Sequence, residues 1–147
     1  MSYRLNKYQL EKYSRQIILK DVGALGQKKI IKSKVLIVGM GGLGCPVAEF
    51  LTRAGIGNIG IVDFDKVDLS NIHRQSLFNL KDLKKSKVIV AKKKLNKINI
   101  QTKVECYNLK LNKKNQSKII KKYDYIVDGS DNFETKLLVN DFCKKYK

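Results

Sequence analysis

One segment constrains the fold more than any other: a short apolar run that ends in a cluster of glycines. The run is Lys34-Val35-Leu36-Ile37-Val38, and Gly39-Met40-Gly41-Gly42-Leu43-Gly44 follows it directly. A continuous branched run of this length predicts a strand that is buried on both faces, and the pattern of residues 43–54 predicts a helix. A strand, a glycine-rich turn and a helix in this order predict the start of a parallel α/β sheet.

Strand and helix patterns alternate along the rest of the chain. We expect an amphipathic helix over residues 7–19, a short helix over 25–31, strands over 59–63, 102–107 and 125–128, and helices over 85–98, 116–122 and 134–146. This alternation predicts an α/β fold with a Rossmann-like parallel sheet, in which residues 1–33 form an N-terminal helical segment and residues 34–147 the sheet domain. Doubly wound sheets usually have five or six strands, so we expect the chain to be truncated before its sheet is complete.

The glycine motif also predicts how a ligand would be held. Gly39 permits a tight turn, and Gly41 and Gly42 let backbone N–H groups approach an anion, while Gly44 lets the helix pack closely. The amino end of that helix favours a phosphate. Asp63 ends the second strand at a suitable distance for a ribose, so the motif predicts a nucleotide site.

Polar residues follow the second and fourth strands, and they bear on which nucleotide is bound. The first group, Asp63 to Gln75, contains acids, amides and an arginine, and the second reads Asp128-Gly129-Ser130-Asp131-Asn132. Lys87 adds a cation, although Lys84 or Lys85 could take its place. An Asp beside a triphosphate suits Mg²⁺. These types fit a ribose and a triphosphate better than a nicotinamide, so an NAD-binding domain is a weaker alternative.

The chain is strongly basic, with 31 Lys and Arg against 13 Asp and Glu and a formal net charge of +18. A basic surface can bind nucleic acid by releasing counterions from phosphate. Arginine, the usual bidentate ligand of bases and phosphates, occurs at four positions only, and the excess is lysine. Lys, Asn and Ile are all abundant and have codons rich in A and T. Genome bias and solvated helix faces therefore explain the charge better than a polyanion site, and we do not expect a nucleic-acid partner.

The cysteines and the apolar segments indicate the compartment. Cys45, Cys106 and Cys143 lie far apart, without a Cys-x-x-Cys pair and with a single His in the chain. Neither a zinc site nor a disulfide framework follows from this pattern. No run reaches the ~18 uncharged apolar residues of a membrane helix, and no secretory signal is visible. We expect a cytoplasmic protein with no membrane association.

Taken in order, these motifs resemble a known family. The matching residues are Arg15-Gln16-Ile17-Ile18-Leu19, Gly26-Gln27, the glycine loop, Asp63-x-Asp65, Ser70-Asn71-x-x-Arg74-Gln75, Lys87 and Asp131-Asn132. The sequence is similar to the MoeB/ThiF/HesA adenylyltransferases, which are related to ubiquitin-activating enzymes. The resemblance implies an ATP-dependent adenylyltransferase that activates the C-terminal Gly-Gly carboxylate of a small ubiquitin-like sulfur-carrier protein, of the thiamine or molybdenum-cofactor type.

The resemblance also implies roles for individual residues. The glycine loop would lie against ATP, Asp63 on the ribose with Asp65 nearby, and Asp131 on Mg²⁺. Phosphates would be held by Asn71, Arg74 and Lys87, with support from Gln75. The residues implied to bind the nucleotide are Gly39, Gly41, Gly42, Asp63, Asp65, Ser70, Asn71, Arg74, Gln75, Lys87, Asp131 and Asn132, and those implied in catalysis are Arg15, Arg74, Lys87 and Asp131.

The family arrangement implies partners as well. A homodimer is expected, in which Arg15 reaches the γ-phosphate of the other subunit's ATP, and a sulfurtransferase could act downstream. Bacterial members carry two Cys-x-x-Cys pairs for structural zinc beyond the equivalent of Lys147, so structural zinc is not supported in this chain. A non-catalytic nucleotide-binding fragment or pseudoenzyme of the same family is the alternative.

Overall fold

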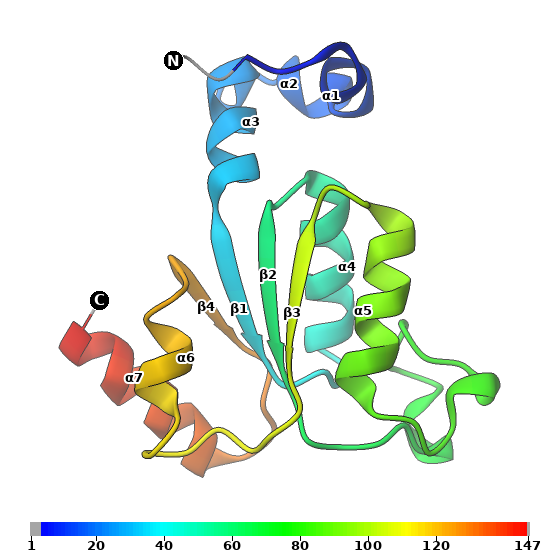
Figure 1. Cartoon of the computed structure of the whole chain (residues 1–147), viewed down its shortest axis with the longest axis vertical. Coiled ribbons are helices and arrows are strands. Elements are labelled where there is room, and N and C mark those ends of the chain that lie inside the picture. The colour runs from blue at the N-terminus through cyan, green and yellow to red at the C-terminus, as the bar shows by residue number, and fades with distance from the viewer. Residues whose placement is uncertain (1–3, 147) are drawn as a thin grey trace.

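The computed structural model describes residues 4–146, and its centre is a four-stranded parallel sheet (Figure 1). The strands are β1 (Lys34–Val38), β2 (Asn58–Val62), β3 (Lys103–Tyr107) and β4 (Tyr125–Asp128), in the spatial order β3-β2-β1-β4. The chain builds outward from β1 to β3 and then returns to the other side of β1. This confirms the α/β fold and creates a point between β1 and β4 where the strand order reverses, which is where such sheets bind ligands.

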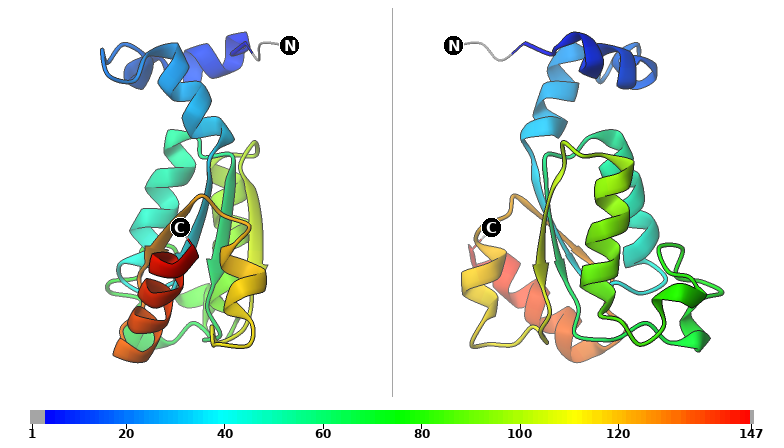
Figure 2. Two further views of the ribbon diagram at one scale, coloured as in Figure 1. Left: turned by 90° about the vertical axis from the view of Figure 1, so that its left-hand side faces the viewer. Right: turned by 45° about the vertical axis from the view of Figure 1, so that its right-hand side comes forward.

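Helices cover both faces of the sheet (Figures 1 and 2). On one face lie α4 (Gly44–Ala54) and α5 (Lys87–Ile98), and on the other α6 (Gln116–Ile120) and α7 (Phe133–Tyr146). Alternate strand residues serve the two cores: Ile37 packs in the cluster beneath α4 and α5, and Leu36 in the cluster beneath α6 and α7. Both residues are fully buried. Because side chains alternate between faces along a strand, a strand covered on both sides must be apolar throughout.

Gly60 in β2 makes room for one large residue of the second core. A Cβ at this position would lie 2.3 Å from the Tyr123 ring and 2.8 Å from Leu36 Cδ1. The Tyr123 hydroxyl lies 3.1 Å from that of Tyr107, and both hydroxyls donate to Glu105. This hydrogen bonding, that from Tyr107 above all, lowers the pKa of Glu105. The missing side chain in β2 therefore lets a buried tyrosine pack directly on the sheet.

Three helices precede β1: α1 (Lys7–Lys12), α2 (Ser14–Ile17) and α3 (Gly23–Lys32). The single helix expected over residues 7–19 is wrong, because the chain breaks at Tyr13. This side chain is 2 % exposed, its ring lies against Gly55, and its hydroxyl accepts a hydrogen bond from Asn99 Nδ2 at 3.0 Å. A continuous helix would keep Tyr13 on a helix face, whereas the break lets it insert beside the end of α4.

The remaining elements agree closely with the predicted ranges. The connection after β2 contains two short 3₁₀ helices, η1 (Leu69–Asn71) and η2 (Leu80–Asp82), which the sequence did not predict. Both begin with a side-chain cap, from Asp68 and Asn79 respectively. Within the part of the chain that the structure describes, no helix is long and apolar enough to cross a membrane.

Candidate functional site: a cavity at the carboxyl edge of the sheet

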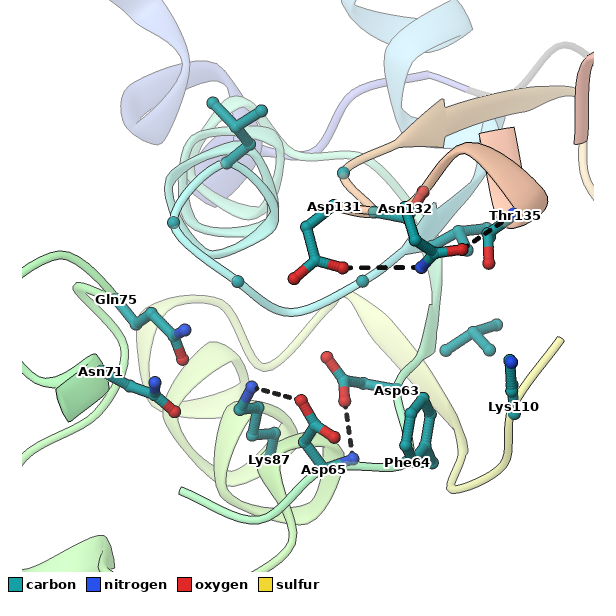
Figure 3. A pocket seen from close by; sticks show the side chains of 18 of the residues that line it. Asp63, Phe64, Asp65, Asn71, Gln75, Lys87, Lys110, Asp131, Asn132 and Thr135 are labelled. Carbon is teal, nitrogen blue, oxygen red and sulfur yellow. Dashed lines mark hydrogen bonds and ion pairs between the residues drawn. The ribbon is translucent and has the colours of Figure 1, made fainter. Parts of the chain in front are cut away.

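A cavity of about 960 Å³ opens where β1, β2 and β4 end. The loops that follow the four strands and the start of α5 surround it, and Figure 3 shows polar side chains that point into it. The residues expected from the sequence that line it are Gly39, Gly41, Gly42, Asp63, Asp65, Asn71, Arg74, Gln75, Lys87, Asp131 and Asn132. Segments from separate parts of the chain therefore meet at the predicted edge of the sheet.

The glycine loop is fixed at its ends and open in its middle. Gly39 has a φ of +91°, and a Cβ there would stand 2.8 Å from the carbonyl oxygen of Gly129. A Cβ on Gly44 would stand 1.8 Å from the carbonyl oxygen of Gly39. A Cβ on Gly41 would meet no atom within 4 Å, so this side of the loop faces open space. Bare backbone at Gly41 and Gly42 thus borders the cavity, as phosphate binding by backbone N–H groups requires.

Asp63 connects the glycine loop to the next segment. Its Oδ2 accepts from the backbone N–H of Met40 at 2.7 Å, and its Oδ1 accepts from the N–H of Asp65 at 2.8 Å (Figure 3). A carboxylate has about four acceptor sites, so two contacts leave room for hydroxyl donors. The carboxylate is therefore oriented before any ligand arrives.

The sequence left open whether Lys84, Lys85 or Lys87 supplies a cation to the site, and of these three only Lys87 lines the cavity. Lys87 is 4 % exposed, and its Nζ lies 3.0 Å from Asp65 Oδ2. Lys84 pairs instead with Asp68 at 3.5 Å, and Lys85 Nζ donates to the carbonyl of Lys81. A buried ammonium is costly without a counter-charge, and Asp65 supplies one.

The turn that carries Asn71, Arg74 and Gln75 brings three polar side chains to one wall. Arg74 Nη1 donates to the Ser70 carbonyl at 2.8 Å, and its stem lies where it would touch a Cβ on Gly42. Asn71 Oδ1 accepts from the Asp68 N–H at 3.4 Å. Gln75 is 3 % exposed. The wall thus offers a guanidinium and two carboxamides to the cavity.

Ser70 is not among the residues that line the cavity, in contrast to its expected place in the site. Its hydroxyl donates to Asp68 Oδ1 at 2.9 Å, and its N–H donates to the same oxygen at 3.0 Å. The Ser70 N–H does most to lower the pKa of the Asp68 carboxyl. The motif around Ser70 therefore shapes η1, because the Ser70 hydroxyl is occupied by the Asp68 carboxylate that caps that turn.

Asp131 and Asn132 lie on the turn between β4 and α7. Asp131 is exposed, and its Oδ1 accepts from Asn132 Nδ2 at 3.5 Å (Figure 3). Asn132 Oδ1 accepts from the Thr135 N–H at 2.9 Å, so this side chain caps the start of α7. Among residues 4–146, no group of three or more His, Cys, Asp or Glu side chains could hold a metal ion. A cation at Asp131 would need the ligand itself to complete its coordination.

Arg15, predicted to be catalytic, does not line this cavity. It is exposed on α2, which lies beyond the opposite end of the sheet (Figure 1). Arg15 therefore cannot act on the cavity of its own chain in this arrangement.

Several residues that line the cavity were not singled out from the sequence. They include Phe64, which is 59 % exposed, and the segment Leu109-Lys110-Leu111 after β3. Phe64, Leu109 and Leu111 carry no ionisable or nucleophilic group, and Lys110 is one of many lysines in the chain. Their place after a strand could have indicated them, because a loop that follows a parallel strand lies at the same edge of the sheet as the other ligand-binding loops.

The cysteines contribute no reactive group to the cavity. Cys45 is buried, its Sγ donates to the Met40 carbonyl at 3.5 Å, and burial raises its pKa to about 11. Burial also raises the pKa of Cys106. Both thiols are therefore protonated at neutral pH and behave as core residues.

The fold and the cavity together are those of the Rossmann class of α/β proteins, with the ligand site at the point where the strand order reverses. A model of the ThiF family matches residues 13–147. The chain therefore belongs to the ThiF family.

Curated relatives cover nearly all of this chain. The sulfur carrier protein adenylyltransferase of Thermus thermophilus is 44 % identical over 138 residues, which are 94 % of this chain and 51 % of the relative. The adenylyltransferase and sulfurtransferase MOCS3 of Drosophila virilis is 46 % identical over 139 residues, or 95 % of this chain and 31 % of the relative. The chain thus spans about half of the length of the first relative and about a third of the second.

Solved structures agree with the fold. E. coli MccB in complex with MccA-N7isoASN superposes with a TM-score of 0.81 at 30 % identity, over 95 % of this chain and 42 % of that chain. E. coli tRNA N6-threonylcarbamoyladenosine dehydratase TcdA, in complex with ATP, gives a TM-score of 0.87 at 21 % identity, over 97 % of this chain and 58 % of that chain. The second likeness shows the shared fold alone.

Proposed function

We propose that this chain provides the ATP-binding part of an adenylyltransferase that activates the C-terminal carboxylate of a small ubiquitin-like sulfur-carrier protein. The observation that carries the proposal is the cavity, which combines a bare glycine loop, a buried lysine and an exposed aspartate at the carboxyl edge of the sheet. The relatives named above are adenylyltransferases, which supports the same activity.

Each part of the cavity suits one part of ATP. Asp63 is oriented to accept ribose hydroxyls, and the backbone at Gly41 and Gly42 is open to the phosphates. Arg74 and Lys87, with Asn71, supply donors to the triphosphate. Asp65 holds Lys87 in place until the phosphates share that cation.

The reaction requires charge stabilisation rather than proton transfer. A carboxylate oxygen of the carrier attacks the α-phosphorus, the bond to the bridging oxygen of the β-phosphate breaks, and pyrophosphate leaves with that electron pair. Attacking and attacked groups are both anionic, so cations must offset the repulsion. The nucleophile is already ionised, and no general base is needed. This agrees with a cavity that is lined by lysines, an arginine, carboxamides, carboxylates and hydroxyl groups, with no histidine among the described residues that line it.

Asp131 fits a role as magnesium ligand. Mg²⁺ usually binds one or two carboxylates together with substrate phosphates and water, rather than a cage of protein ligands. Asp131, an exposed carboxylate that lines the cavity, matches that donor set. When bound, the ion would neutralise charge on the phosphates and stabilise the leaving pyrophosphate.

Arg15 fits a role in a second subunit. Arg15 lies away from the cavity of its own chain. The family resemblance implies that it contacts the triphosphate bound by a neighbouring chain. A guanidinium suits this role because it is always charged and binds two phosphate oxygens at once. We therefore propose a homodimer in which each Arg15 completes the partner's site. A sulfurtransferase acting on the activated carrier is the further partner.

The test starts with ligand binding to the chain itself. ATP with Mg²⁺ should raise the midpoint of thermal unfolding, and NADH should not, because only a ligand of the native state stabilises it. Protection by NADH without protection by ATP would refute the adenylation proposal. Binding of ATP without ATP–pyrophosphate exchange in the presence of carrier would indicate a non-catalytic member of the family.

A further inference from the structure

One buried side chain in the cavity has no hydrogen bond. Gln75 is 3 % exposed, its Oε1 is buried without a partner, and no hydrogen bond of its side chain is found among residues 4–146. Other buried carboxamides are paired: Gln27 accepts from Gln16 and donates to the Ala54 carbonyl, and Asn99 donates to Tyr13 and Thr52. A buried unpaired acceptor is costly. Of the two such side-chain atoms among residues 4–146, Gln75 Oε1 and Gln116 Oε1, only the first belongs to a residue that lines the cavity, where a ligand can supply the missing donor.

The backbone holds this side chain in position. The Gln75 N–H donates to the Asn71 carbonyl at 3.0 Å, and the Gln75 carbonyl accepts from the Phe78 N–H at 3.0 Å. Leu77 and Phe78, two and three residues further on, are buried in the core beneath α4 and α5. Figure 3 shows the carboxamide pointing into the cavity, on the same wall as Asn71 and near Lys87. The group therefore faces the ligand and cannot easily turn away.

The hydrogen-bonding pattern of Gln75 indicates what it binds. A carboxamide offers an N–H donor and a carbonyl acceptor side by side. Phosphate oxygens only accept, so they would leave Oε1 unpaired, and metal-bound water would pair with Oε1 alone. An adenine could pair with both atoms, but it lies on the far side of the ribose from the phosphates, whereas Gln75 lies beside the residues that suit the triphosphate. The terminal residue of an extended tail presents its N–H and one carboxylate oxygen on the same side, so it can pair with both atoms of the carboxamide.

We propose that Gln75 is a specificity residue that binds the terminal residue of the substrate's C-terminal tail through its peptide N–H and its carboxylate. The inference rests on the proposed function, because an attacking C-terminal carboxylate brings its own preceding peptide group close to the α-phosphate. The Gln75 Oε1 accepts from the N–H of the terminal residue, and Nε2 donates to the carboxylate oxygen of that residue that does not attack the α-phosphorus. The cavity then selects a carboxylate that is preceded by a peptide N–H over a small carboxylate without one.

The test removes the N–H of the last peptide bond from the substrate. A synthetic hexapeptide ending in Gly-Gly is compared with its analogue in which an ester replaces the last peptide bond and removes the N–H. Binding of each to the full chain, loaded with a non-hydrolysable ATP analogue and Mg²⁺, is measured by calorimetry. We expect the ester to bind about tenfold more weakly, as for one hydrogen bond whose acceptor is left buried and unpaired.

Two variants show whether this discrimination comes from Gln75. Gln75→Met keeps the length of the side chain without its polar atoms, and the ratio of the two dissociation constants should fall to about one. Gln116→Met is the matched control: Gln116 Oε1 is also buried and unpaired, but Gln116 lies on α6 and does not line the cavity, so the tenfold ratio should persist.

Other outcomes would overturn the inference. Equal binding of peptide and ester to the unmodified chain would mean that Oε1 serves another donor, such as a metal-bound water. The inference would also be overturned if the nucleotide-loaded chain bound neither the peptide nor the ester. A chain that fails to bind the ATP analogue contradicts the proposed function itself, so the two failures are distinguishable.

Discussion

Asp131 is the single residue on which the proposed chemistry depends most. Replacing it with Asn keeps the size of the side chain and its capacity to accept from Asn132 but removes the charge. Loss of one electrostatic contact to a transition state costs about 3 kcal/mol, so ATP–pyrophosphate exchange should fall roughly 100-fold or more. Nucleotide binding should survive in part through the glycine loop.

The control for this variant is Asp141→Asn, an exposed acid on α7 that does not line the cavity. Its exchange rate should match that of the unmodified protein. If Asp131→Asn also exchanged at the unmodified rate, the magnesium ligand would have to be elsewhere.

At this scale, residue type and motif spacing predicted most of the polar lining of the cavity, but not how each side chain is used. The sequence placed Ser70 with the ligands, whereas its hydroxyl caps η1 through Asp68. It could not choose among the lysines near residue 87, because only the path of the chain after η2 shows which ammonium is buried against Asp65. It showed a glutamine at position 75 but not the missing hydrogen-bond partner.

Substitutions at two glycines should separate the effect on stability from the effect on ATP binding. Gly60→Ala places a methyl group against the buried Tyr123 ring and should lower the free energy of unfolding by about 1–3 kcal/mol. Gly41→Ala places a methyl group in open space, so stability should stay within about 1 kcal/mol while ATP affinity falls. Denaturant unfolding and calorimetric titration separate the two effects. A stable Gly60→Ala, or a Gly41→Ala with full ATP affinity, would contradict this division.

The elements themselves could be predicted where burial dictates the pattern. The four strands agree to within about a residue, because β1 and β2 are covered on both faces and must be apolar. The break at Tyr13 could not be predicted, since its partner Asn99 lies 86 residues further along the chain. The loop at residues 109–111 was missed for a similar reason: its place beside the cavity follows from the topology, not from its own residues.

At the scale of the whole molecule, the separation of Arg15 from its cavity gives a prediction about assembly. Arg15→Ala and Asp131→Asn should each be inactive alone and should complement when mixed. In a mixed dimer one site lacks both groups, and the other has its own Asp131 and the partner's Arg15. Random exchange places half of the subunits in such dimers, so roughly a quarter of the unmodified activity should return. Subunit exchange without recovered activity would show that Arg15 does not act across subunits.

The position of β1 between β2 and β4 also has a consequence for how the chain is made. Leu36 and Val38 pair with Asn58–Val62 soon after synthesis, but with β4 only after residues 39–124 have followed. At about 5–20 residues per second, this interval lasts roughly 5–20 s on the ribosome. During it, one edge of the central strand and the face that α6 and α7 later cover remain exposed. The nascent chain is therefore a natural client for chaperones that bind extended apolar segments.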